Sequence, residues 1–197
     1  MRARSLTLLL ALLSPSPGMA GPPFVWECRF DSTLVLCPAG DVAFHGYVAR
    51  SGPYPNAQVD VDFPSAPAVR ILEALDGSYL QSGGRTFAMS DGQGLVAMSL
   101  RGGGVNAAEI EVRADGLTIC RRPVASFDQD GDLIVDAADE AIAAARVGTT
   151  DRTADFDGDQ VVTEADLAAL RRHRGHAAES PTAVLIGSWG RLKAAYR

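Results

Sequence analysis

The stretch "DQDGDLIVDAAD", residues 128–139, recurs in register as "DFDGDQVVTEAD" at residues 155–166, an offset of 155 − 128 = 27. Gly148 recurs at the same offset as Gly175, so an acidic loop, a helix-forming run and a glycine stop repeat as one unit. Carboxylates this close together repel one another unless a cation lies among them or water surrounds them. Two copies in register, each followed by a helix-forming run, favour a bound cation over a merely solvated loop.

The spacing of the aspartates meets the requirements of Ca²⁺, which takes about 6–8 oxygen ligands at about 2.3–2.6 Å. A loop of about 12 residues supplies them from positions 1, 3, 5, 7, 9 and 12, and position 7 uses its backbone carbonyl. Zn²⁺ prefers nitrogen and sulfur ligands, and Mg²⁺ prefers tight octahedral sites that keep several waters. The sequence therefore predicts two Ca²⁺ ions, one held by Asp128, Asp130, Asp132, the Ile134 carbonyl, Asp136 and Asp139, and the other by Asp155, Asp157, Asp159, the Val161 carbonyl, Thr163 and Asp166.

These two repeats, over residues 126–176, resemble a dockerin domain, which has two calcium loops with Asp at position 12, each followed by a helix. The resemblance implies a secreted module with one Ca²⁺ in each loop and helices that dock onto a cohesin-like partner. Position 6, usually Gly, is Leu133 or Gln160 here, and a left-handed turn there would cost a non-Gly residue roughly 1–2 kcal/mol. Positions 10 and 11, often Ser/Thr in cohesin-binding dockerins, are Ala137-Ala138 and Glu164-Ala165. The resemblance therefore supports calcium binding, at reduced affinity, more strongly than it supports binding to a cohesin.

The helix-forming runs "AADEAIAAARV" (137–147) and "TEADLAALRRHR" (163–174) contain few large apolar residues. Residues 125–166 hold 12 acidic side chains against two basic ones. A core this thin does not readily offset backbone ordering entropy of about 1–2 kcal/mol per residue. The second half of the chain is therefore expected to be poorly ordered without calcium.

The first half has the period of two that is typical of strands with one buried face. In "AQVDVDF" (57–63) and "AEIEVRA" (108–114), apolar and polar residues alternate strictly. Glycine-rich turns separate these runs from further expected strands at 24–30, 33–37, 42–50, 68–74, 94–100 and 117–123. Short strands at this spacing predict an antiparallel β-sandwich.

Over residues 38–118 the chain resembles a bacterial immunoglobulin-like domain of the invasin type. The resemblance depends on "VAFHGYVARSGPYPNAQVDVDF" (42–63), "SDGQGLVAMSL" (90–100) and "AAEIEVRADG" (107–116). It implies a fold that is mainly β with a small α part: an immunoglobulin-like β-sandwich followed by a dockerin-like pair of calcium loop–helix repeats. The expected organisation is a signal peptide at 1–20, the sandwich at 21–124, the calcium module at 125–176 and a tail at 177–197.

The N-terminal residues 1–20 have a basic start, a short apolar run and small residues at the end, which is typical of a secretory signal peptide. No stretch is long enough to span a bilayer, which takes about 20 apolar residues. Without Arg2 and Arg4, 18 − 2 = 16 basic residues face 24 acidic ones, a net charge of 16 − 24 = −8 that argues against a nucleic-acid partner. The expected location is the cell surface or the medium, with the oligomeric state left open.

Three cysteines follow the signal peptide: Cys28, Cys37 and Cys120. Outside the cytoplasm two of them could pair, and a Cys28–Cys37 bridge is favoured because the two lie on neighbouring strand-like runs. The histidines His45, His173 and His176 form no ligand pattern with Cys or Glu in the sequence. In the tail, Trp189, Leu192 and Tyr196 would share a helical face, which suits either a docking helix or a sorting tag.

The sequence contains no arrangement that predicts catalysis. Asp60 and Asp62 lie on one face of one expected strand, whereas a glycosidase pair straddles its substrate at about 5–10 Å. The chain is therefore expected to be a secreted, non-catalytic calcium-binding protein with an adhesive, structural or scaffold-docking role. The alternatives are a carbohydrate-binding module or small hydrolase tethered by the dockerin-like part, and a β half that only spaces or caps the calcium half.

Overall fold

Alternating strands come first along the chain and two short helices come last, so the computed structural model is mainly β with a small α part. It describes residues 21–63, 69–81, 85–105 and 109–178. The strands are β1 (Arg29–Phe30), β2 (Leu34–Leu36), β3 (Ala43–Tyr47), β4 (Gln58–Asp62), β5 (Arg70–Leu75), β6 (Tyr79–Gln81), β7 (Arg85–Met89), β8 (Leu95–Gly103), β9 (Glu109–Ala114) and β10 (Leu117–Ser126), and the helices are α1 (Ala137–Ala144) and α2 (Glu164–Arg172).

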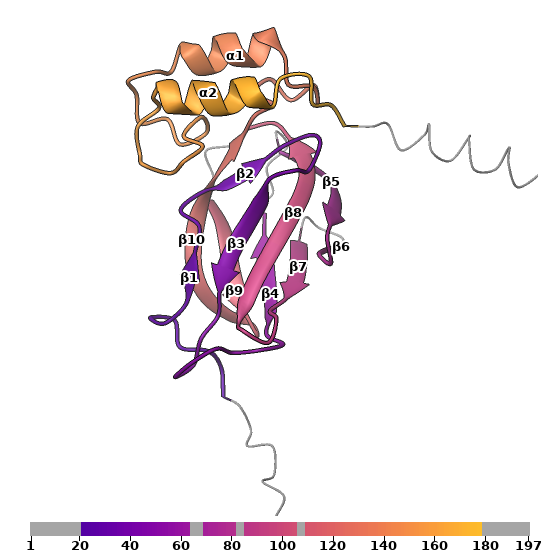
Figure 1. Ribbon diagram of the computed structural model, residues 1–197, viewed down its shortest axis with the longest axis vertical. Helices are drawn as coiled ribbons and strands as arrows, with labels where there is room; N and C mark the ends of the chain where they lie inside the picture. The colour runs from indigo at the N-terminus through magenta and orange to yellow at the C-terminus, as the bar shows by residue number, and fades with distance from the viewer. Residues whose placement is uncertain (1–20, 64–68, 82–84, 106–108, 179–197) are drawn as a thin grey trace, which may run out of the picture.

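The strands form two sheets that enclose one apolar core (Figure 1). One sheet has the order β1-β3-β8-β5, and the other has the order β2-β10-β9-β4-β7-β6. The period of two explains the core: in β4, Val59 and Val61 are fully buried, and their β9 partners Ala114 and Val112 are fully buried as well. Alternation in the sequence therefore predicted the buried faces of these two central strands.

Three features of the β half differ from the expectation. Residues 24–28, expected as part of a strand, form a turn in which the Glu27 and Cys28 amides both donate to the Phe24 carbonyl. Strands β6 and β7 were not expected at all. The sheets are also not wholly antiparallel, because β2 runs parallel to β10 with Val35 opposite Ala125.

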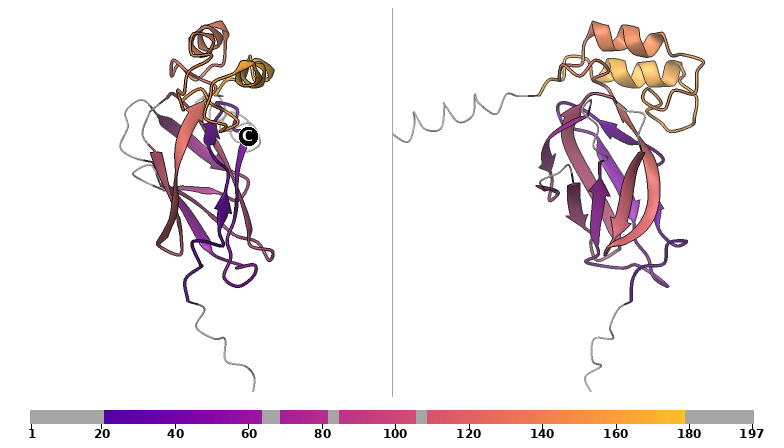
Figure 2. Two further views of the ribbon diagram at one scale, coloured as in Figure 1. Left: turned by 90° about the vertical axis from the view of Figure 1, so that its left-hand side faces the viewer. Right: turned by 180° about the vertical axis from the view of Figure 1, so that it is seen from behind.

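The β half and the helical half are joined without a linker. Strand β10 continues to Ser126, two residues beyond the expected boundary, and the Phe127 amide then donates to the Leu36 carbonyl at 3.0 Å. A second core lies at this junction, with helix α2 beside α1 at one end of the sheets (Figure 2). It combines residues of both halves: Cys37, Phe127, Val135, Ala143, Ala154, Val162, Leu167 and Leu170.

All three cysteines that follow the expected signal peptide are free thiols in this structure, so the favoured Cys28–Cys37 bridge is not formed. Cys28 belongs to the core between the sheets, whereas Cys37 belongs to the core at the junction. The two residues were expected on neighbouring strands, but the strands that adjoin them, β1 and β2, belong to different sheets. Burial raises the pKa of the Cys28 thiol, and it raises that of Cys37 to about 12.

The expected signal peptide (1–20) and the apolar residues of the tail, Trp189, Leu192 and Tyr196, lie outside the described residues. Among the residues that the structure describes, no helix has the length and apolar character needed to cross a membrane.

Candidate functional site

Position 9 of each acidic loop is the N-cap of the helix that follows it. Asp136 is the N-cap of α1, and its side chain accepts a hydrogen bond from the Ala138 amide at 2.6 Å. Thr163 caps α2 in the same way, through the Ala165 amide at 3.1 Å. In each repeat the aspartate at position 12 completes a capping box by accepting from the N-cap amide. The sequence spacing that suits an ion therefore also fixes where each helix begins.

The carboxylate at position 1 organises the backbone of its loop. Asp128 accepts hydrogen bonds from the amides of Gly131 at 2.7 Å and Leu133 at 3.0 Å. Asp155 accepts from the amides at the equivalent positions, Gly158 at 2.8 Å and Gln160 at 2.9 Å. The two loops therefore share one conformation, as the repeat in the sequence predicts.

The carboxylate at position 12 reaches back across its loop. Asp139 accepts from the Gln129 amide at 2.6 Å and the Asp136 amide at 2.7 Å. Asp166 accepts from the corresponding amides of Phe156 at 2.7 Å and Thr163 at 2.8 Å. Position 12 thus draws the end of each loop towards its start, where the position 1 carboxylate lies.

Positions 1, 3 and 12 come together in each loop. One carboxylate oxygen from each of these three residues lies within 4.8 Å of the others, in the groups Asp128, Asp130, Asp139 and Asp155, Asp157, Asp166. Two ligands on opposite sides of a Ca²⁺ ion at about 2.4 Å are about 4.8 Å apart, so this spread suits an ion at the centre. The donors are all oxygen, which suits Ca²⁺ rather than Zn²⁺.

The carboxylates at positions 1 and 12 are withdrawn from water. Asp128 and Asp139 are 0% exposed, Asp155 is 2% exposed and Asp166 is 1% exposed. Burial raises the pKa of Asp128, Asp139 and Asp155 above the ordinary value, because desolvation disfavours the charged form. The backbone amides that donate hydrogen bonds to these carboxylates lower the same pKa values, because they stabilise the charged form. Each loop therefore holds buried negative charge that a cation would stabilise.

The other predicted ligands lie outside these two groups. At position 5, Asp132 and Asp159 accept from the amide two residues on, Ile134 at 2.8 Å and Val161 at 2.9 Å. At position 9, Asp136 and Thr163 are engaged as helix caps, which fits a ligand that acts through water. The apolar side chains of Ile134 and Val161, 45% and 40% exposed, offer no ligand atom, so a ligand from position 7 would have to be the backbone carbonyl.

Each loop is completed by the other repeat. Val135, at position 8 of the first loop, donates its amide to the His176 carbonyl and accepts from the Gly175 amide, each at 2.8 Å. Val162, at position 8 of the second loop, donates to the Thr149 carbonyl at 2.9 Å and accepts from the Gly148 amide at 2.8 Å. Both valines are fully buried, as their apolar character predicted. The buried valine of each loop therefore makes its backbone hydrogen bonds to the other repeat, across the core that the two repeats share.

The β half also contacts the first loop. The Gly104 amide, just beyond β8, donates to the Asp128 carbonyl at 3.1 Å. A side chain at Gly103 would collide with the Asp128 carboxylate, so glycine is required for this close approach. The first acidic loop is therefore held against the end of a central strand.

Position 6 has the left-handed conformation that is typical of a 12-residue calcium loop, with φ of 72° at Leu133 and 78° at Gln160. A non-Gly residue is strained there by roughly 1–2 kcal/mol. Gln160 is exposed, so its side chain is not needed for packing. Gln160→Gly should therefore stabilise the protein by about 0.5–1 kcal/mol, once the greater entropy of the unfolded glycine chain is subtracted.

Chemical denaturation of the Gln160→Gly variant measures this gain. Gln93→Gly is the matched control, because Gln93 is exposed in a turn and is not among the residues with positive φ. The control should lose stability, by up to about 1 kcal/mol. If both variants lose stability alike, position 6 is not strained.

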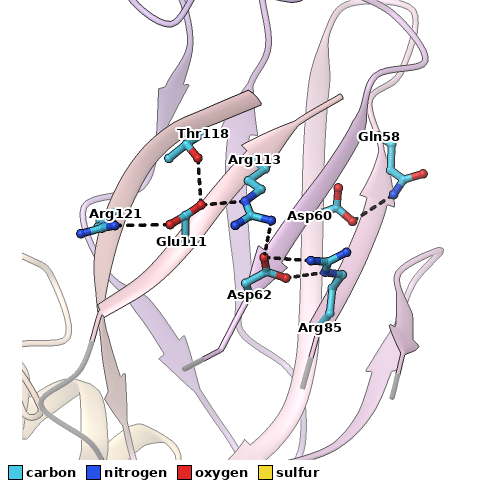
Figure 3. Close-up of polar contacts among 8 residues, drawn as sticks. All are labelled: Gln58, Asp60, Asp62, Arg85, Glu111, Arg113, Thr118 and Arg121. Atoms are coloured by element: carbon cyan, nitrogen blue, oxygen red, sulfur yellow. Dashed lines mark hydrogen bonds and ion pairs between the residues drawn. The ribbon is translucent and has the colours of Figure 1, made fainter. Parts of the chain in front are cut away.

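A network of charged side chains covers part of the outer face of the six-stranded sheet (Figure 3). Asp62 binds Arg85 through both oxygens and lies 3.1 Å from Arg113, and Glu111 binds Arg113 at 2.6 Å. These charges border a depression of about 400 Å³ lined by Asp62, Phe63, Glu109, Glu111, Arg113 and Arg121. Because Arg85 and Arg113 already neutralise the Asp62 carboxylate, Asp62 is not an unpaired charge available as a general acid or base.

Sequence reasoning missed one cluster of side chains, formed by Cys37, Asp41, His173 and His176. Cys37 and His176 are 139 positions apart, so no local spacing could have indicated it.

Comparisons of the chain with protein-family models, with curated proteins and with solved structures found no match. The functional assignment therefore depends on the residues and geometry described above.

Proposed function

We propose that this protein binds two Ca²⁺ ions through its paired acidic loops, as a dockerin-like module carried on an immunoglobulin-like β domain. The observation that carries the proposal is the duplicated group of three carboxylates at positions 1, 3 and 12, two of which are buried in each loop. Buried carboxylates are costly unless they are paired with positive charge. In each loop backbone amides provide part of this compensation, and an ion at the centre of the group would provide the rest.

The direct protein ligands of this proposal are the carboxylates at positions 1, 3, 5 and 12 and the carbonyl at position 7. The residue at position 9 caps its helix and reaches the ion through a water molecule. Calcium would hold the two ends of each loop together, and because each position 8 valine bonds to the other repeat, it would stabilise both repeats at once. The role that follows is structural: calcium maintains a surface on the two helices.

We further propose that the protein is non-catalytic and acts outside the cytoplasm, in adhesion, as a structural element or in docking onto a scaffold. The expected signal peptide supports the location, and the dockerin resemblance supports a cohesin-like or other extracellular protein partner. Affinity capture from the native secretome, with calcium and with chelator, tests the partner. A partner retained only with calcium supports docking through the helical module, and a partner retained equally in chelator contradicts it.

Isothermal titration of chelator-treated, desalted protein tests the calcium sites. Two Ca²⁺ ions should bind per chain. Asp130→Ala and Asp157→Ala each remove an exposed carboxylate from one of the two groups, so each variant should retain one ion and the double variant none. These positions are preferred because the buried carboxylates at positions 1 and 12 also organise the backbone.

Glu164→Ala is the matched control for this titration. It removes one acidic side chain from the same module, at a residue that is 75% exposed and outside both carboxylate groups. The control should still bind two ions with little change in affinity. Equal effects of Glu164→Ala and Asp157→Ala would indicate general attraction to an acidic surface and would exclude the second site.

A further inference from the structure

The cluster formed by Cys37, Asp41, His173 and His176 joins the two halves of the protein. Cys37 directly follows β2, and Asp41 lies four residues later, beyond a turn in which the Gly40 amide donates to the Cys37 carbonyl at 2.9 Å. His173 is the C-cap of α2, and the His176 amide donates to the His173 carbonyl at 3.0 Å. Two tight turns, one in the β half and one in the helical half, therefore each contribute two polar side chains to the cluster.

The four side chains converge through one atom each. His173 Nδ1 and His176 Nδ1 are 3.3 Å apart, and each is 3.3 Å from Asp41 Oδ2. Cys37 Sγ is 3.6 Å from His176 Nδ1. All four atoms lie within 4.8 Å of one another.

Hydrogen bonding alone does not account for this arrangement. His176 Nδ1 has three polar neighbours, namely the Cys37 sulfur, the Asp41 oxygen and the other imidazole nitrogen. An imidazole Nδ1 has either one proton to donate or one lone pair to accept with, so it satisfies one of these contacts well and not three. Four convergent donor atoms around a common point are instead what a metal ion requires.

The distances agree with a tetrahedral ion. With Zn–N of about 2.0–2.1 Å and Zn–S of about 2.3 Å, neighbouring ligand atoms of a tetrahedron are about 3.3–3.4 Å apart for two nitrogens and about 3.6 Å apart for nitrogen and sulfur. An oxygen and a nitrogen ligand are separated by about 3.3–3.4 Å on the same reckoning. The observed distances of 3.3 Å and 3.6 Å match these edges.

We propose that Cys37 Sγ, Asp41 Oδ2, His173 Nδ1 and His176 Nδ1 form a four-coordinate site for Zn²⁺ or a similar transition-metal ion. A donor set of one sulfur, two imidazole nitrogens and one carboxylate oxygen favours this class of metal over Ca²⁺ and Mg²⁺. Four protein ligands leave no open position, so the site is structural and not catalytic. On binding, the thiol of Cys37 releases its proton to solvent, because the thiolate is the ligand.

The surroundings hold the ligands in place. The His173 ring stacks on Phe127 with centroids 4.2 Å apart and planes at 17°, and the two imidazoles are nearly perpendicular at 84°. Cys37 is fully buried, so the sulfur is shielded from bulk solvent.

The consequence is a clamp between the β half and the helical half. The His176 carbonyl accepts from the Val135 amide, so the clamp is adjacent to the first acidic loop without sharing any ligand with it. The site therefore stands independently of whether the acidic loops bind calcium.

Cobalt is a direct probe of this site. The full-length, untagged protein is stripped with chelator, returned to excess calcium so that the acidic loops are saturated, and titrated with Co²⁺ under reducing conditions. The expected result is one equivalent of Co²⁺ with the visible bands of a tetrahedral ion and a near-ultraviolet thiolate-to-cobalt charge-transfer band, both removed by added Zn²⁺. A pale octahedral spectrum in the wild-type protein would overturn the proposal.

Two variants and two matched controls identify the ligands. Cys37→Ser should abolish the charge-transfer band, and His176→Gln, which changes a side chain near the surface, should weaken Co²⁺ binding by more than about tenfold. Cys120→Ser and His45→Gln alter the same residue types outside the cluster and should leave the spectrum unchanged. An unchanged spectrum in Cys37→Ser or in His176→Gln would also overturn the proposal, and circular dichroism confirms that each variant is folded.

Discussion

Removal of calcium should lower the midpoint of thermal unfolding by about 10–20 °C. In calcium at about 100 times the Kd, each site contributes about 2.7 kcal/mol of stability, and two sites contribute about 5 kcal/mol. For a chain of this size about 1 kcal/mol corresponds to about 2–4 °C. The physical source is the burial of Asp128, Asp139, Asp155 and Asp166, whose charges would lose the proposed Ca²⁺ counter-ions on chelation.

Calorimetry in calcium and in EGTA measures this shift. Strained loops of this kind are expected to bind Ca²⁺ with a Kd of about 10⁻⁴ M, so a calcium concentration of about 10 mM gives the required excess of about 100 times the Kd. Amide hydrogen exchange should place the loss of protection in residues 128–176. The Asp130→Ala, Asp157→Ala double variant is the control, because its midpoint should be the same in both solutions. A wild-type midpoint that does not respond to EGTA would contradict the prediction.

Phe127→Ala should destabilise the protein by about 3–5 kcal/mol, the range for removing a buried aromatic ring. Phe127 is 3% exposed and lies between Phe156, at a centroid distance of 4.6 Å, and His173, at 4.2 Å. It follows directly on β10, and its amide bonds to Leu36 of the β half. The substitution therefore leaves a cavity at the place where the two halves share a core.

Chemical denaturation in saturating calcium gives the size of the loss, and hydrogen exchange shows whether α1 and α2 lose protection before the sheets do. Trp26→Ala is the matched control, because Trp26 is 70% exposed and its removal should cost no more than about 0.5 kcal/mol. A loss below about 1 kcal/mol in Phe127→Ala would mean that the two halves are stabilised separately.

The sequence predicted the repeat unit well, because a loop of fixed spacing is a local feature. The helix starts, the inward valines and the left-handed residues at position 6 all follow from spacing within each repeat. The same reasoning missed β7 because its pattern is inverted: the inward residues are the small Thr86 and Ala88, and the outward ones include Phe87 and Met89. Apolar character therefore did not mark the buried face.

Features that depend on distant parts of the chain could not be predicted. The core of the helical half was judged thin from its own residues, but the β half contributes Val35, Cys37, Ala39 and Val42 to it. The parallel pairing of β2 with β10 and the separation of Cys28 from Cys37 follow from how the two sheets pack, which local patterns do not specify. The Cys37–His176 cluster was missed for the same reason.

Val135 and Val162 each make their backbone hydrogen bonds to the other repeat, and this has a consequence for how such a module can arise. A lone unit of this kind would leave the amide and carbonyl of its own buried valine without partners, and only a second copy supplies them. Two separate copies would meet this need by forming a two-fold symmetric dimer, whose stability depends on concentration. Joining them in one chain, 27 residues apart, makes the association intramolecular and independent of dilution.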